Sequence, residues 1–141
     1  MPKAYLSRRY HFSASHRLHS EAYDEARNRE IYGKCNNPHG HGHNYVVEVT
    51  IGGPVSADTG MVMDLTALDA VVQKEILDRF DHTNLNLSSE FSEAVPTTEN
   101  LIVRIYELLR GRLGEATLEN VVVEETGNNT FQYAGQKEIL H

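Results

Sequence analysis

The chain of 141 residues lacks the features that mark several large protein classes. It has a single cysteine, Cys35, so an internal disulfide framework is excluded. Its longest apolar runs, such as residues 121–123, are far too short to span a bilayer. Residues 1–5 lack the apolar core of a secretory signal. The free thiol and the missing signal together predict a cytoplasmic protein.

Basic residues are also scarce, because 13 Lys and Arg stand against 20 Asp and Glu, which gives a formal net charge of −7. General nucleic-acid binding needs a basic face, so it is not expected. No Gly/Ser-rich or Pro-rich linker and no repeat divides the chain, and we expect one domain over residues 1–141. Histidine is unusually frequent, with eight copies.

Hydrophobic periodicity predicts four strands and two helices. The strands are expected at residues 4–15, 44–51, 118–126 and 130–134. The helices are expected at residues 64–79 and from 97 to about 113, and residues 20–38 are expected to be mainly a long connection. This order predicts an α+β fold in which antiparallel hairpins form a sheet and both helices cover one face.

Histidines are the strongest candidates for metal ligands. His41 and His43 are two residues apart at the start of the second strand, on the same face as Tyr45 and Val47. His16 ends the first strand and can face them if the two strands pair. Three neutral imidazoles would leave a tetrahedral zinc ion one open position, which is the catalytic pattern. The alternative is a polar, solvated loop.

Two further sites carry reactive groups, each with a plainer interpretation beside it. Cys35 follows Lys34 in a polar, turn-forming stretch, where a cation would favour the thiolate. A lone cysteine is otherwise a small buried hydrophobe. Asp81 can orient an imidazole such as His82, although adjacent residues rarely make that contact directly. The alternative for this pair is the polar turn that ends a helix.

A carboxylate near the end of the third strand is the last candidate. Glu125 is in phase with Val121 and Val123, so it points inward if the strand stays regular. An inward carboxylate is costly unless a ligand satisfies it, and the alternative is a frayed, wet strand end. The segment Thr97–Thr98–Glu99 caps the second helix, and backbone donors there could also meet a ligand.

Seven separated motifs in order resemble the 6-pyruvoyl-tetrahydropterin synthase family across nearly the whole chain. They lie at residues 12–18, 33–38, 41–45, 60–64, 81–85, 97–100 and 125–126. The resemblance implies the tunnelling fold, with a four-stranded antiparallel sheet and two helices per subunit. It also implies that three subunits close a barrel and that two trimers stack into a homohexamer with intersubunit active sites.

The same resemblance implies a role for each candidate residue. His16, His41 and His43 match zinc ligands, and Cys35 matches the base that removes a proton from the substrate side chain. Asp81 and His82 match proton-relay partners from a neighbouring subunit. Glu125 matches the carboxylate that anchors the pterin, and Thr97, Thr98 and Glu99 match a segment that helps close the pterin pocket.

The implied reaction converts 7,8-dihydroneopterin triphosphate to 6-pyruvoyl-tetrahydropterin and triphosphate. No nicotinamide is needed, and the sequence has no Gly-x-Gly-x-x-Gly fingerprint. The candidates for phosphate contact are Arg8, Arg9, Arg17 and Lys137. Expected partners are therefore the pterin triphosphate and further copies of the chain, with no nucleic acid and no membrane.

One departure keeps a second enzyme open. Because position 39 is also histidine, Cys35 precedes a His-Gly-His at two offsets. The shorter offset, to His39 and His41, resembles 6-carboxy-tetrahydropterin synthase. The longer one, to His41 and His43, resembles the pyruvoyl enzyme and leads directly into the strand, so we prefer it. A non-catalytic zinc-binding or pterin-binding module is the alternative outside enzymes.

Overall fold

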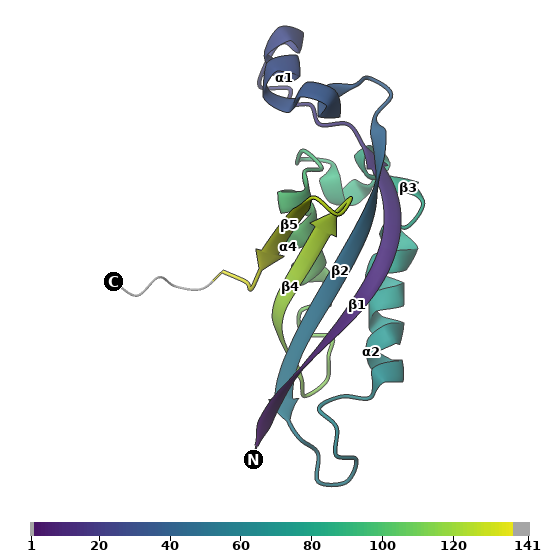
Figure 1. Ribbon diagram of the computed structural model, residues 1–141, viewed down its shortest axis with the longest axis vertical. Coiled ribbons are helices and arrows are strands. Elements are labelled where there is room, and N and C mark those ends of the chain that lie inside the picture. The colour runs from purple at the N-terminus through teal and green to yellow at the C-terminus, as the bar shows by residue number, and fades with distance from the viewer. Residues whose placement is uncertain (1, 137–141) are drawn as a thin grey trace, which may run out of the picture.

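The computed structural model describes residues 2–136, and its framework is a hairpin of two long strands. β1 (Lys3–His16) and β2 (His41–Pro54) run antiparallel along the length of the molecule (Figure 1), in register from Lys3 opposite Pro54 to His16 opposite His41. This single register decides which side chains share a face at both ends of the hairpin, because a strand alternates with period two.

Three shorter strands complete the sheet in the order β3-β1-β2-β4-β5. β4 (Thr117–Glu125) pairs antiparallel with β2, and β5 (Asn129–Tyr133) pairs antiparallel with β4. β3 (Thr83–Asn84) runs parallel to β1. The prediction of a purely antiparallel four-stranded sheet was therefore wrong, because the chain returns alongside β1 just after the first predicted helix.

The two predicted helices are present, and both begin with a side-chain cap. α2 (Leu65–Val72) continues through a π-helical turn, η2 (Gln73–Leu77), into α3 (Asp78–Phe80). α4 (Thr98–Leu109) follows two short 3₁₀ turns, η3 (Leu85–Leu87) and η4 (Ser89–Phe91). Asp64 accepts a hydrogen bond from Ala67 N, and Thr97 accepts one from Asn100 N. No helix within residues 2–136 has the length and apolar character needed to cross a bilayer.

A third helix lies where a connection was expected. α1 (Glu25–Tyr32) leads into a 3₁₀ turn, η1 (Gly33–Asn36), and together they stand beyond the end of the sheet (Figure 1). Asp24 caps α1 by accepting from Arg27 N at 2.7 Å. Asn28 is its one buried residue, so the helix has no apolar stripe for periodicity to detect. This prediction was wrong for that reason.

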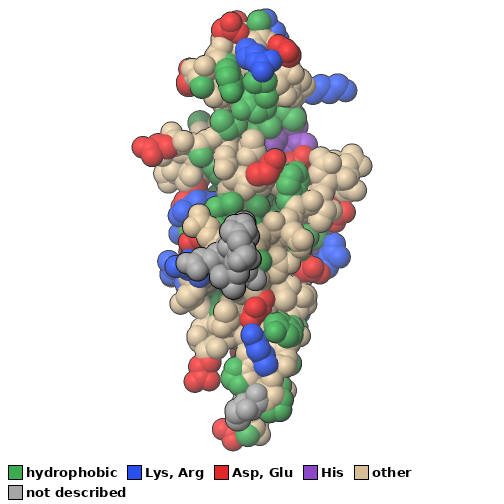
Figure 2. Space-filling model, turned by 90° about the vertical axis from the view of Figure 1, so that its left-hand side faces the viewer, with side chains coloured by type: hydrophobic (Ala, Val, Ile, Leu, Met, Phe, Trp, Pro, Cys, Tyr) green, Lys and Arg blue, Asp and Glu red, His purple; other side chains and the backbone are tan. Residues whose placement is uncertain are grey.

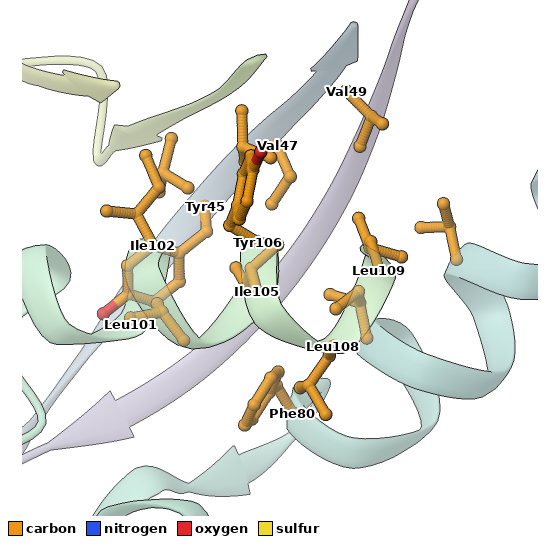
Figure 3. Packing of buried hydrophobic residues seen from close by; sticks show 14 of the residues in the cluster. Tyr45, Val47, Val49, Phe80, Leu101, Ile102, Ile105, Tyr106, Leu108 and Leu109 are labelled. Carbon is orange, nitrogen blue, oxygen red and sulfur yellow. The ribbon is translucent and has the colours of Figure 1, made fainter. Parts of the chain in front are cut away.

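The core lies between one face of the sheet and the helices α2 and α4. Tyr45, Val47 and Val49 of β2 lie on the face of the sheet that is turned towards α4 (Figure 3), and they belong to the same buried cluster as Leu101 and Ile105. The next positions along the strands are polar: Arg9, Glu48 and Thr50 are among the residues on the opposite face. The sheet is therefore amphipathic, with a covered face and a polar face.

Packing of α4 on the sheet should dominate the stability of this layer. Ile105 is fully buried in the core, whereas Val103 on the same helix is 39% exposed. Ile105→Ala should lower the free energy of unfolding by about 2–5 kcal/mol, because it removes buried methylenes and leaves a cavity. Val103→Ala should change it by less than about 1 kcal/mol. Denaturant titrations compare the two, and equal midpoints would contradict this packing.

Candidate metal centre and active site

Three histidines meet where β1 ends and β2 begins. Antiparallel pairing sets His16 opposite His41 and Ala14 opposite His43, so all three imidazoles lie on one face of the sheet. Their ring centroids are 4.4, 4.8 and 4.9 Å apart. One potential ligand nitrogen from each ring lies within 4.8 Å of the others. The grouping is that of a three-ligand metal site.

The protein backbone orients His16. Its side chain is 1% exposed, and Nδ1 lies 2.9 Å from the carbonyl oxygen of Pro96. A carbonyl only accepts, so Nδ1 donates and Nε2 keeps its lone pair. Nε2 is buried without a hydrogen-bond partner among residues 2–136. A buried, unprotonated nitrogen beside two other imidazoles fits a bound metal cation.

The other two imidazoles complete the cluster. His41 Nε2 lies 2.7 Å from His43 Nε2, and His43 Nδ1 lies 2.6 Å from Thr126 Oγ1. Burial is the main cause that lowers the pKa of His16 and of His41, and the neighbouring imidazoles lower both pKa values further. Both rings are therefore neutral near pH 7, which is the form that binds a metal.

A carboxylate lies beside this cluster. Glu125 pairs with Tyr45 across β4 and β2, and its Oε1 lies 3.8 Å from His43 Nε2. The buried hydroxyl of Thr98, in the first turn of α4, donates a hydrogen bond to Glu125 Oε2. Glu124 points to the opposite face, where it meets Arg9. An anion with one oxygen fixed by a hydroxyl and the other aimed into the site can hold a cationic or hydrogen-bond-donating ligand.

The three candidate residues at the start of α4, Thr97, Thr98 and Glu99, differ in what they contact. Thr97 accepts from Asn100 N at 3.1 Å, so its hydroxyl serves as the cap of α4. Glu99 is exposed in the first turn. The structure thus brings Thr98 to the carboxylate, whereas the side chains of Thr97 and Glu99 are not in that contact.

Cys35 reaches the same region from the 3₁₀ turn η1. Its carbonyl accepts a hydrogen bond from Leu18 N at 2.7 Å, which ties the turn to the segment that follows β1. Burial raises the pKa of the Cys35 thiol, and the negative charge of Glu125 raises it further. In the absence of a nearby cation the group is a thiol at pH 7 and is a weak base.

Asp81 and His82 follow α3 and contact β1 at Ser13. Asp81 Oδ1 accepts from Ser13 N at 2.9 Å, and His82 N donates to Ser13 O at 2.6 Å. The Asp81 and His82 side chains contact each other at 3.1 Å. They border pockets with Ser13 and Asn44, whose side chains point to the polar face of the sheet, and the pocket that His82 borders is also lined by His43 and Thr126. Within residues 2–136, no hydrogen bond or ion pair joins Asp81 or His82 to the three clustered histidines.

The structure adds Tyr45 to the site. Its ring is 1% exposed and stacks on Phe12 with centroids 4.9 Å apart. Its hydroxyl is buried without a hydrogen-bond partner in the described part of the chain. Burial, followed by the charge of Glu125, raises the pKa of Tyr45, so the hydroxyl keeps its proton. Strand parity placed Tyr45 on this face, but a core-facing tyrosine gave no reason to single it out.

Candidate phosphate ligands have protein partners in the described chain. On the face seen in Figure 2, basic and acidic side chains are interspersed, and histidine reaches the surface below the α1 end. Lys137 lies outside the described residues. The partners of the other three are Asp69 for Arg8 at 2.7 and 3.1 Å, Glu124 for Arg9 at 3.4 Å, and the Asn36 carbonyl for Arg17 at 3.2 Å.

His39 provides a matched control for the metal site, because it is exposed and lies outside the cluster. His41→Ala should remove most of the bound metal, since two imidazoles bind far more weakly than three, whereas His39→Ala should keep it. Metal content should also fall in acid, because protonated imidazole cannot bind, and the fall should begin below the ordinary histidine pKa of about 6.5, because burial lowers the pKa of His16 and His41. Elemental analysis of dialysed protein measures both effects. Full occupancy in His41→Ala would contradict the assignment.

Comparisons with known proteins agree with this geometry. The family model described as 6-pyruvoyl tetrahydropterin synthase matches residues 5–136. The 6-pyruvoyl tetrahydrobiopterin synthase of Drosophila melanogaster is 46% identical over 95% of this chain and 81% of its own length. The 6-carboxy-5,6,7,8-tetrahydropterin synthase of Bacillus subtilis is 31% identical over 94% of this chain and 86% of its own.

A solved structure extends the likeness to three dimensions. The 6-pyruvoyl tetrahydropterin synthase of Caenorhabditis elegans superposes with a TM-score of 0.89 at 43% identity, covering 96% of this chain and 98% of that one. The family model spans nearly all of the described residues, including the histidine cluster, Cys35 and Glu125. The chain belongs to the 6-pyruvoyl tetrahydropterin synthase family.

Proposed function

We propose that the chain is a zinc-dependent carbon–oxygen lyase that converts 7,8-dihydroneopterin triphosphate to 6-pyruvoyl-tetrahydropterin and triphosphate. The observation that carries the proposal is the gathering of three imidazoles beside a carboxylate on one sheet face. The Cys35 thiol lies close enough to that carboxylate for its charge to add to the effect of burial in raising the thiol pKa. A binding module needs the imidazoles and the carboxylate, but it has no use for a base. The free thiol also favours a reducing compartment such as the cytoplasm.

Zinc suits the donor set proposed here. His16, His41 and His43 offer three neutral nitrogen atoms, which leaves a tetrahedral ion one position for substrate. Zinc bound there would polarise the side-chain hydroxyls of the substrate and make the adjacent carbon-bound hydrogens more acidic. Pro96 helps by fixing the proton of His16 on Nδ1, so that Nε2 is ready to coordinate without rearrangement.

Glu125 holds the pterin in this proposal. A carboxylate can accept from the pterin amino group and a ring N–H together, and two parallel hydrogen bonds fix both position and orientation. Thr98 supports it, because its hydroxyl restrains one carboxylate oxygen. The protonated Tyr45 hydroxyl, buried on the same face, adds a donor to this wall of the site.

Cys35 is the proposed base, and its activity depends on its neighbours. Burial raises the pKa of the thiol and the negative charge of Glu125 raises it further, so a site without metal or substrate disfavours the thiolate. A pterin that donates hydrogen bonds to Glu125 would offset part of that negative charge, and a dication held by the three histidines would lower the thiol pKa. We therefore expect metal and substrate together to favour the thiolate. The thiolate then takes the carbon-bound proton.

The proton relay is completed by a neighbouring copy of the chain. Asp81 and His82 lie beside the polar face of the sheet, and within the described residues neither makes a hydrogen bond or ion pair with the histidine cluster of its own chain. The sheet ends at the edge strands β3 and β5, and closure with other copies would pair or cover these edges. We therefore propose a homohexamer made of two stacked trimers, with each active site between subunits.

The carboxy-forming reaction is the second candidate, and the similarity to the Bacillus subtilis protein favours it. It would break the substrate side chain and release a two-carbon aldehyde. The shorter cysteine-to-histidine offset on which it depends uses His39. His39 is exposed and lies outside the histidine cluster. His41 and His43, the two histidines at the longer offset from Cys35, both belong to the cluster. The geometry therefore supports the pyruvoyl product.

The position of Glu125 predicts a sharp difference between adjacent carboxylates. Glu125→Gln should lower pterin affinity or kcat/KM by at least tenfold, because the amide replaces an acceptor with a donor and removes the charge. Glu124→Gln should have little effect, since Glu124 faces Arg9 on the other side. Titration with a pterin ligand and steady-state kinetics measure both. The reverse pattern would contradict the assignment.

Mixed assemblies test whether the site is shared between subunits. Cys35→Ala and His82→Ala should each be inactive alone. Hexamers assembled from both chains should regain activity, because some sites then combine an intact Cys35 with an intact His82. Each mixed assembly is compared with unmixed controls after the same unfolding and reassembly. Well-mixed assemblies without recovered activity would place both residues in one subunit.

Product analysis tests the reaction itself. Given dihydroneopterin triphosphate, the protein should release one inorganic triphosphate and keep all three side-chain carbons in a pyruvoyl product. Chromatography with mass detection separates this product from a carboxy product. Cys35→Ala should abolish turnover but retain the metal, because the thiol acts as a base and not as a ligand. Dominant acetaldehyde formation would favour the second candidate, and no turnover by the metal-loaded protein would favour a binding module.

A further inference from the structure

Thr126 occupies a backbone position that suits it poorly. It follows β4, where Thr126 has φ of 50° and Gly127 has φ of 76°, and Asn128 N donates to Glu125 O at 3.1 Å. Two left-handed residues in succession form the tight turn in which Asn-Gly or Gly-Gly is favoured. A β-branched residue is rare at positive φ, because its side chain crowds the backbone. The turn geometry gives no reason for threonine.

The contact made by the Thr126 side chain explains why threonine stands at this position. Thr126 Oγ1 lies 2.6 Å from His43 Nδ1, and Thr126 N donates to Asn44 O at 2.8 Å. Both contacts tie the turn to β2 at a metal ligand and the residue after it. The unfavourable φ thus places a hydroxyl against the ring nitrogen that faces away from the cluster. Strained backbone that persists at such a place is a signal of function.

We propose that Thr126 is a positioning residue for the metal centre, and this inference rests on the metal site of the proposed function. Thr126 Oγ1 accepts a hydrogen bond from His43 Nδ1–H, so that Nε2 presents its lone pair to the ion. The Pro96 carbonyl does the same for His16. A ring nitrogen that donates to a fixed acceptor orients the imidazole and makes it a more basic ligand.

The Pro96 carbonyl and the Thr126 hydroxyl differ in one respect. A carbonyl can only accept, whereas a hydroxyl can also donate, and donation to His43 Nδ1 would put the ring proton on Nε2 and block coordination. Metal binding therefore selects the accepting orientation of Thr126. Because Thr126 is exposed, water can replace part of its contact, and the loss on removing it is expected at the lower end of the usual range.

Three substitutions separate the hydroxyl from the backbone. Thr126→Val removes the hydroxyl but keeps the β-branched shape, Thr126→Ser keeps the hydroxyl, and Thr126→Gly removes the side chain and relieves the backbone. Zinc affinity of each full-length protein is measured by competition with a chelator, and the melting temperature is measured without metal. His41→Ala serves as the control for the metal site itself.

If Thr126 positions His43, zinc affinity and melting temperature should change differently among the three variants. Thr126→Val and Thr126→Gly should each weaken zinc binding by about tenfold, and Thr126→Ser should stay within about threefold of the parent. The metal-free Thr126→Gly protein should nevertheless melt above Thr126→Val, because glycine accepts positive φ. A merely structural role would make zinc affinity follow the melting temperature instead.

Two results would overturn the inference: parental zinc affinity in Thr126→Val, or a loss in Thr126→Ser as large as that in Thr126→Val. If either occurs while His41→Ala has lost its zinc, only the role of Thr126 fails. If His41→Ala keeps its zinc, the metal site of the proposed function fails as well. The two failures are therefore distinguishable.

Discussion

The register of β1 against β2 is the constraint on which the site depends. Because His16 stands opposite His41, the last residue of one strand and the first of the next bring their imidazoles together with His43. A shift of one residue would send His41 and His43 to the polar face and leave His16 alone. The same register sets Tyr45 opposite Phe12 in the core. The register that packs the core therefore also brings the three candidate metal ligands together.

Charge placement links the parts of the site. Burial, followed by the charge of Glu125, raises the pKa of both Cys35 and Tyr45, and burial favours neutral His16 and His41. Without a cation the region thus holds a carboxylate beside groups that remain uncharged. A dication held by the three histidines would change this balance, because its charge would favour the thiolate form of Cys35. The proposed chemistry requires that change, since a thiol is a poor base.

Much of this arrangement could be predicted from short-range patterns. Period two placed His41, His43 and Tyr45 on one face, and the same parity separated Glu125 from Glu124. Apolar stripes and caps located α2 and α4. These features succeed because each depends on a few neighbouring residues and on burial of one face.

The remainder depends on contacts that sequence spacing does not encode. α1 has no apolar stripe, and β3 is two residues long, so neither leaves a periodic signal. The Pro96 carbonyl contacts His16 Nδ1, and the positive φ of Thr126 places its hydroxyl against His43 Nδ1. Nothing in the spacing of the residues specifies either contact. The positions of Asp81 and His82 follow from the sheet edge. Family resemblance assigned them a role, but their place beside Ser13 of β1 required the fold.

X-ray absorption at the zinc edge of the metal-loaded protein tests the central claim most directly, because it reports the atoms bound to the ion. The account predicts one zinc per chain with three imidazole nitrogens at about 2.0–2.1 Å and one oxygen. A sulfur ligand at about 2.3 Å would contradict it, because it would make Cys35 a ligand and leave the reaction without its proposed base.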